Sequence, residues 1–113
     1  MGGEMARYVL IAMNGPTPDG SAEALEDWYE NIHLVDLKSC EGIKTARRFK
    51  TVRGVIPGKE LWPNVAIYEI ETDDLAELSK EMQAKCRPFH PDFDRSRSGH
   101  IFAIQTAGDP FPE

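Results

Sequence analysis

Residues 65–71 have the sequence "VAIYEIE", in which Val, Ile and Tyr favour an extended backbone. We predict a strand here. Residues 43–53, "IKTARRFKTVR", alternate loosely between apolar and polar side chains, which predicts another strand. Residues 54–64 separate the two, and their two glycines and two prolines indicate an irregular connection. Two successive strands therefore occupy the middle of the chain.

A helix is predicted on each side of this pair of strands. Upstream, apolar side chains over residues 22–38 recur at three- and four-residue steps, as on one face of a helix, and Ser21 is placed to act as the N-cap. Downstream, residues 74–86 show the same spacing, with Thr72 or Asp73 as the expected cap. Both helices are amphipathic, so each is expected to bury one face against the strands.

Two further strands are predicted towards the ends of the chain, over residues 6–13, "ARYVLIAM", and residues 100–107, "HIFAIQTA". The resulting order, β-α-β-β-α-β, is typical of a ferredoxin-like α+β fold with a four-stranded antiparallel sheet and two helices on one face. The length favours a single domain over residues 1–113. Residues 1–5 and 108–113 are expected to be irregular tails.

The predicted sheet has more apolar surface than two helices can cover. In the strand over residues 6–13, Tyr8, Leu10 and Ala12 alternate with other apolar side chains, so both faces are apolar. Helices cover only one face, and the second would be left as an exposed apolar patch. We therefore expect a homodimer in which the sheets of two copies pack together.

Composition and charge exclude several classes of protein. The net charge is −6 and the pI is about 5.0, which argues against a nucleic-acid-binding protein. There is no run of about 18 apolar residues, so no membrane span is expected. Two cysteines without a secretory signal predict free thiols in a reducing, cytoplasmic environment.

The first helix carries a motif with a family resemblance. Its pattern is W-Y-x-x-x-H-L-x-D-L over residues 28–37, followed by Gly42 and by "ARRF" at residues 46–49. This pattern, together with the order of the elements, resembles the dimeric α+β barrel superfamily, and within it the EthD-like proteins. The resemblance implies a dimer with a pocket between sheet and helices in each subunit, and His33 as the histidine of the site. The superfamily includes cofactor-free monooxygenases, polyketide cyclases, dehydratases, decarboxylases, isomerases and haem-binding proteins.

Four residues are candidates for catalysis. A neutral imidazole accepts and returns protons near neutral pH, which makes His33 the first candidate for the general acid or base. Asp36 lies three residues later, on the same helix face, where it would orient the ring of His33. Tyr68 is expected to donate a hydrogen bond to a developing oxyanion, and His100 to supply a second proton transfer.

Further residues are candidates for substrate binding, because aromatic and cationic side chains around an apolar pocket suit a ring-shaped substrate. They are Tyr8, Trp28, Tyr29, Arg48, Trp62, Phe89 and His90. No spacing of histidines and carboxylates predicts a metal site, and no glycine-rich nucleotide motif is present. We therefore expect no cofactor.

The leading hypothesis is a cofactor-independent enzyme of the lyase or isomerase type, such as a dehydratase, cyclase or decarboxylase. It would transfer protons on an apolar aromatic or polyketide-like substrate, with His33 as general acid or base. One alternative is a quinol monooxygenase or haem-binding protein of the same fold. Another is a protein that binds a small molecule without catalysis. The sequence leaves open the substrate and whether the 54–64 or the 87–99 connection closes the pocket.

Overall fold

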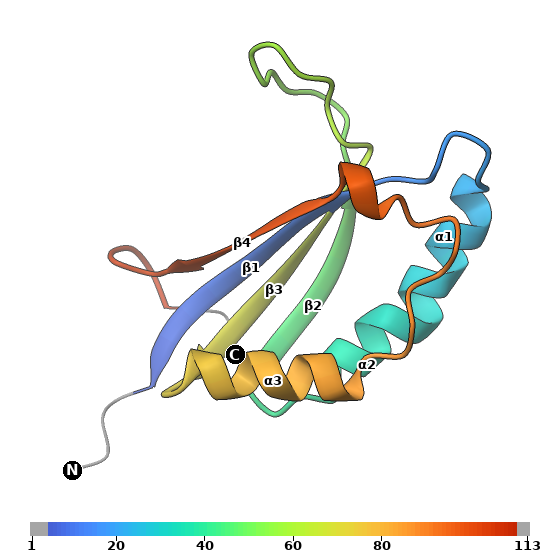
Figure 1. Ribbon diagram of the computed structural model, residues 1–113. Helices are drawn as coiled ribbons and strands as arrows, with labels where there is room; N and C mark the ends of the chain where they lie inside the picture. The colour runs from blue at the N-terminus through green and yellow to red at the C-terminus, as the bar shows by residue number, and fades with distance from the viewer. Residues whose placement is uncertain (1–4, 111–113) are drawn as a thin grey trace.

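The computed structural model describes residues 5–110 and contains one four-stranded sheet (Figure 1). The strands lie close to their predicted positions, although the second and the fourth each end three residues earlier than expected. Their bounds are β1, Ala6–Asn14; β2, Ile43–Lys50; β3, Asn64–Thr72; and β4, Gly99–Ile104. The predicted tail residues 1–4 and 111–113 lie outside the described part of the chain, and residues 108–110 have no regular structure.

The first helical segment covers the predicted range but is not one α-helix. It consists of α1, Ala22–Trp28, a π-helical turn η1, Tyr29–His33, and α2, Leu34–Lys38, which follow one another without a break. The second helix is α3, Leu75–Lys85, and a short 3₁₀ turn η2, Arg95–Arg97, precedes β4. Over residues 5–110, no helix has the length and apolar character that a membrane crossing requires.

Local hydrogen bonds explain where the helices begin. The Ser21 hydroxyl accepts from the Ala24 N–H at 3.0 Å, which confirms the predicted N-cap. The cap of α3 is Asp74, whose side chain accepts from the Glu77 N–H at 3.0 Å. The prediction of Thr72 or Asp73 was wrong, because Thr72 still belongs to β3 and its hydroxyl instead accepts from the Asp74 N–H.

The sheet has the order β2-β3-β1-β4, and every pair is antiparallel. This order and the element sequence β-α-β-β-α-β are those of a ferredoxin-like α+β fold, as predicted. Register places Leu10 opposite both Tyr68 and Phe102, and places Ala46 opposite Tyr68. These four residues therefore form a row across one face of the sheet.

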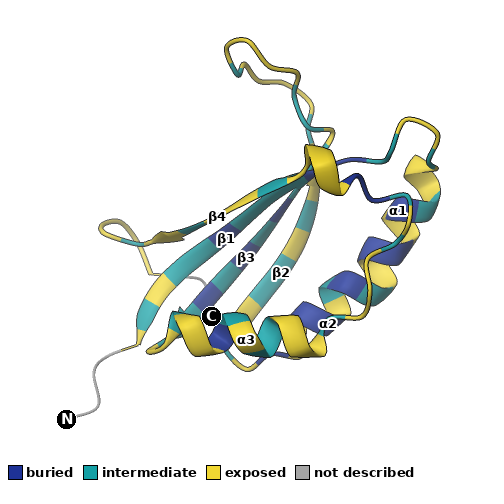
Figure 2. Cartoon of the chain, in the orientation of Figure 1, coloured by how far each residue is buried: buried dark blue, intermediate teal, exposed yellow. Residues whose placement is uncertain are grey.

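The core lies between that face and the helices, all of which lie on the same side of the sheet (Figure 1). The stretches of α1, η1 and α2 coloured as buried lie on the side of the helices towards the sheet, and the exposed stretches lie on the outer side (Figure 2). Leu25, Tyr29, Tyr68 and Ile70 are among the largest fully buried side chains. Burial of such side chains stabilises the fold by about 1.5–3 kcal/mol each.

Candidate active site

A cavity of about 840 Å³ lies between the sheet and the helices, and it contains most of the predicted site residues. Its walls come from β1, η1, α2, β3, α3 and β4, and from residues 86–98, which connect α3 to β4. The volume is in the usual range for small-molecule sites. The other connection, residues 51–63, projects away from the domain in Figure 1 and contributes no lining residue.

The connection over residues 86–98 is fixed at both ends, so it forms a defined wall of the cavity. At its start, Arg87 binds Asp36 on α2. Towards its end, the Asp92 carbonyl accepts from the Thr17 N–H at 2.8 Å, and the Asp94 N–H donates to the Gly15 carbonyl at 3.1 Å. The sequence leaves open whether the 54–64 or the 87–99 connection closes the pocket. In the structure, the second of these connections forms the cavity wall.

His33 lies in the wall of the cavity within a cluster of aromatic rings. The Trp28 ring stacks on its imidazole, with the centroids 4.8 Å apart and the planes 19° apart. The Tyr29 and Phe89 rings lie 5.0 and 5.1 Å from it. The π-helical turn explains the stacking, because His33 is five positions after Trp28 and residues i and i+5 lie one above the other in a π-helix.

Burial among these rings lowers the pKa of His33 from 6.5 to about 4, since an apolar environment disfavours the imidazolium, and the nearby Asp36 carboxylate opposes the shift only in part. His33 is therefore neutral at pH 7, so its unprotonated nitrogen has a free lone pair, and burial makes it a weaker base than a free imidazole. Its Nδ1 is buried and has no hydrogen-bond partner among the described residues. Nε2 also has no hydrogen-bond partner among residues 5–110, and it is not one of the fully buried polar atoms of that range.

This shift predicts a loss of stability in mild acid. The unfolded chain takes up a proton on His33 near its pKa of 6.5, whereas the folded chain takes it up only near 4. The contribution of His33 to the free energy of unfolding is thus fully present above pH 6.5. As the pH falls from 6.5 to 4, this contribution decreases by about 3 kcal/mol. Urea denaturation at several pH values should show this loss in the native protein and a smaller one in His33→Leu.

The matched control is His100→Gln, because His100 is exposed at the other side of the cavity. This variant controls for the loss of one histidine, and the fall in stability that depends on His33 should remain in it. Acid protonation of carboxylates also destabilises the fold, so the difference between variants isolates the His33 effect. Identical curves for the native protein and His33→Leu between pH 6.5 and 4 would contradict a buried neutral imidazole.

Asp36 does not have the role predicted for it. Its carboxylate accepts from the Arg87 guanidinium Nη2 at 2.7 Å and from the Arg87 backbone N–H at 2.9 Å. Within residues 5–110, no hydrogen bond joins Asp36 to His33. The Arg87 guanidinium holds the pKa of the Asp36 carboxyl below its usual range. Asp36 therefore anchors the cavity wall, and the His33 ring is oriented by its aromatic neighbours.

Two buried tyrosines of the cavity wall are joined by a hydrogen bond between their hydroxyls. The Tyr29 and Tyr68 hydroxyls lie 3.2 Å apart, and the Asn14 side-chain amide donates to the Tyr29 oxygen at 3.4 Å. The Tyr29 oxygen accepts from Asn14, so the Tyr29 O–H can donate a hydrogen bond to the Tyr68 oxygen. The Tyr68 O–H is then free to donate a hydrogen bond to a ligand. Burial raises the pKa of both hydroxyls, so both remain protonated donors.

Arg48 lies behind the tyrosines and not in the cavity wall, contrary to its predicted role in substrate binding. Its guanidinium carbon is 4.7 Å from the centre of the Tyr29 ring, and it forms an ion pair with Glu26. The Arg48 side chain is only 8% exposed. A cation held over an aromatic ring stabilises the local packing, and here it places positive charge close to the hydrogen-bonded tyrosine pair.

The other predicted residues divide into two groups. His90, His100 and Phe89 line the cavity, and the His90 Nδ1 accepts from the Asp92 N–H at 3.0 Å. Trp28, Tyr8 and Trp62 do not line it. Trp28 lies behind His33, Tyr8 packs against the core at the far end of β1, and Trp62 donates to the Arg97 carbonyl.

Several lining residues were missed by the sequence prediction. Asn14 lies one residue beyond the strand predicted over residues 6–13, yet it ends β1 on the face that bears Leu10. Arg87, Arg95 and Met82 were passed over because their sequence neighbours give no sign of a site. Cys86, predicted only as a free thiol, lines the cavity, and burial raises the pKa of its thiol to about 11. The alternation of side chains along β1 was the one signal that could have identified Asn14.

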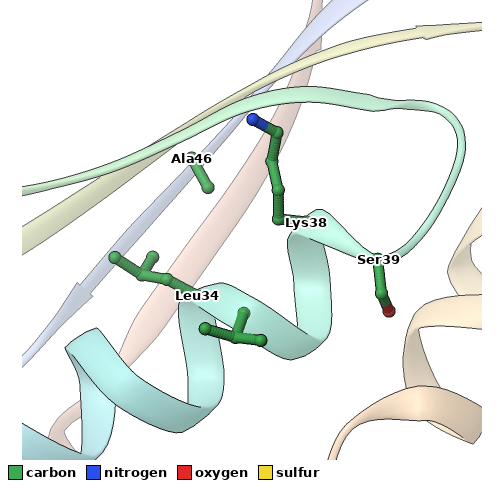
Figure 3. Close-up of a pocket in the computed structure, with 5 residues that line it drawn as sticks. Leu34, Lys38, Ser39 and Ala46 are labelled. Atoms are coloured by element: carbon green, nitrogen blue, oxygen red, sulfur yellow. The ribbon is translucent and has the colours of Figure 1, made fainter.

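A second hollow, of about 440 Å³, lies between α2 and β2 (Figure 3). It is lined by Leu34, Val35, Lys38, Ser39 and Ala46, and it is open to solvent. It brings together no pair of acid and base groups, so we do not assign the chemistry to it. Over residues 5–110, no three His, Cys, Asp or Glu side chains lie close enough together to hold a metal ion.

The fold and the cavity define the class of protein, a ferredoxin-like α+β domain with an aromatic-lined cavity between sheet and helices. Among solved structures, this chain is similar to a proposed monooxygenase from Shewanella loihica PV-4, with a TM-score of 0.56 and 14% sequence identity. The match covers 96% of this chain and 100% of that chain. At this identity the likeness establishes the fold. No family model and no curated protein matches the sequence, so the EthD-like assignment stays a prediction.

Proposed function

We propose that this protein is a cofactor-independent enzyme whose general base, His33, removes a proton from an apolar, hydroxylated aromatic or polyketide-like substrate. The observation that carries the proposal is a buried, neutral imidazole in the same cavity as the Tyr68 hydroxyl. The base would accept the proton on Nε2. Tyr68 would donate a hydrogen bond to the oxygen on which negative charge develops, which is the largest usual source of catalysis at such sites.

The anion formed in this way has two possible fates. It can take up a proton at another atom, which gives isomerisation, cyclisation or dehydration. It can instead reduce dioxygen, so that a CH₂ group beside a carbonyl or aromatic ring becomes a ketone and one water is released. The likeness to a proposed monooxygenase favours the second fate. Both fates begin with proton removal, and His33 has the same role in each.

Anthrone tests the proposal, because its CH₂ group is acidic and its rings are apolar. The native protein should accelerate deuterium exchange at that CH₂ group in D₂O without oxygen, relative to buffer. With oxygen present, an electrode should record uptake of one O₂ for each anthraquinone formed. Exchange without oxygen uptake would favour the lyase or isomerase alternative. Binding of anthrone with neither reaction would favour a protein that binds without catalysis.

We also propose that the face of the sheet opposite the helices is covered by a second copy of the chain. Register places Ile11 between Ile67 and Ile101 on that face, and Ile101 is 52% exposed in the single chain. Phe49, at 45% exposure, lies on the same face of β2. A stable dimer buries about 1,200–2,000 Å² in total, which the outer face of a four-stranded sheet can supply.

Sedimentation velocity should find a dimer for the native protein and a monomer for Ile101→Lys, because a charge at this position would be buried without a partner. The control is Val35→Lys. Val35 is exposed to a similar extent, 54%, but it lies on α2, away from the sheet's outer face. It should remain a dimer. A native protein that sediments as a monomer would contradict the proposal.

A further inference from the structure

The wall of the cavity differs in charge from the rest of the chain. The sequence has 19 Asp and Glu against 13 Lys and Arg, with a net charge of −6. Even so, no described Asp or Glu lines the cavity, whereas Arg87, Arg95 and all three histidines of the chain do. Arginine and histidine side chains donate hydrogen bonds and carry no negative charge. The cavity is therefore a region of an acidic protein in which an anion meets no like charge in the wall.

Arg87 and Arg95 differ in their partners. The Arg87 guanidinium is occupied by Asp36 at 2.7 Å, so its charge is already neutralised. Arg95 forms no ion pair with any residue of the described range 5–110. Its guanidinium carbon lies 5.2 Å from the centre of the Phe89 ring. Arg95 thus brings an unmatched positive charge to the cavity wall.

Phe89 connects this cation to the proposed base. The Phe89 ring is 5.1 Å from the His33 ring and also packs against Phe93, at 4.8 Å. Arg95 and His33 therefore contact the same aromatic side chain. A ligand with its reacting end at His33 can extend along the Phe89 ring to reach the guanidinium of Arg95.

We propose that the cavity binds an anionic ligand, an apolar ring system with one carboxylate that Arg95 binds at the end remote from His33. One unmatched arginine suits the single negative charge of a carboxylate, and the planar guanidinium matches its two oxygens. This inference deepens the proposed function by adding a carboxylate to the substrate. It relies on that function only for the identity of the reacting end.

Two ligands of nearly equal shape test the inference, 2-naphthoate and the uncharged 2-naphthamide, by isothermal titration calorimetry. The native protein should bind 2-naphthoate about tenfold more tightly than 2-naphthamide. Arg95→Gln should reduce this preference to within about twofold and leave 2-naphthamide binding unchanged. Arg95→Lys keeps the charge but loses the planar pair of donors, so part of the preference should remain.

The matched control is Arg97→Gln, which removes the same charge from the same turn, η2. Arg97 pairs with Glu60 at 3.1 Å on the surface and does not line the cavity, so this variant should keep the full preference. Equal losses in Arg95→Gln and Arg97→Gln would show a general effect of net charge and overturn the inference. A native protein that binds the two ligands equally, or binds neither, would also overturn it.

Binding and turnover can be separated by experiment. His33→Ala removes the proposed base but leaves Arg95 in place, so the preference for 2-naphthoate should persist in that variant. If the native protein does not react with anthrone but still prefers 2-naphthoate, the proposed reaction fails while the anion site stands. If anthrone reacts and the preference is absent, the anion site fails while the proposed reaction stands.

Discussion

His33→Ala should lower kcat/KM for anthrone by about 10²–10⁴-fold, because no other described side chain places a neutral, buried base in the cavity wall beside the Tyr29–Tyr68 pair. The loss should fall mainly on kcat, since proton removal occurs in the transition state. Steady-state kinetics and circular dichroism on the same preparation would separate loss of the base from loss of the fold. Full turnover by this variant would rule out His33 as the base.

A rescue experiment strengthens this test. His33→Ala leaves a space beside Trp28 the size of an imidazole ring, so added imidazole should restore part of the activity in proportion to its concentration. Added pyrrole, a ring of similar shape without a basic nitrogen, is the control and should restore none. Rescue by both rings would show that His33 acts by filling space and not by accepting a proton.

Tyr68→Phe should lower kcat by about 10²-fold, the usual cost of removing one hydrogen-bond donor to an oxyanion. KM should change little, because the donor acts on charge that develops in the transition state. The variant also leaves the Tyr29 hydroxyl without its partner at 3.2 Å, so the unfolding free energy should fall by about 1 kcal/mol. Kinetics and urea denaturation measure the two effects separately.

Tyr29→Phe is the comparison for Tyr68→Phe. Tyr29 lies one step further from the ligand along the hydrogen bonds from Asn14 to Tyr68, so its removal should cost less in kcat and a similar amount in stability. If Tyr29→Phe lowers kcat more than Tyr68→Phe does, Tyr29 and not Tyr68 is the donor to the substrate. If neither variant changes kcat, the tyrosine pair has no part in the reaction.

The architecture was predictable from the sequence because it depends on short-range patterns. Apolar side chains every third or fourth residue predict the helix over residues 22–38, and β-branched side chains predict the strand that contains Tyr68. His33 was predictable as a site residue because it belongs to a motif within one helix. Each of these inferences needed only neighbours along the chain.

The surroundings of His33 were not predictable in this way. Asp36 lies three residues from His33, yet it binds Arg87, 51 residues away. Its choice of partner depends on where the chain returns after α3, and spacing along one helix contains no such information. Arg95 likewise reaches the cavity only because residues 86–98 cross it. The charged residues of the site are therefore determined by contacts between distant parts of the chain, which local spacing does not reveal.

The π-helical turn over Tyr29–His33 has a consequence for comparing this protein with its relatives. Such a turn corresponds to one extra residue inserted into an α-helix. It stacks Trp28 and His33, which are five positions apart, where an ordinary helix would stack residues four positions apart. A relative without the turn would carry its histidine four residues after its tryptophan. Aligned without a gap, the two histidines would fall in different columns although they occupy the same place in space.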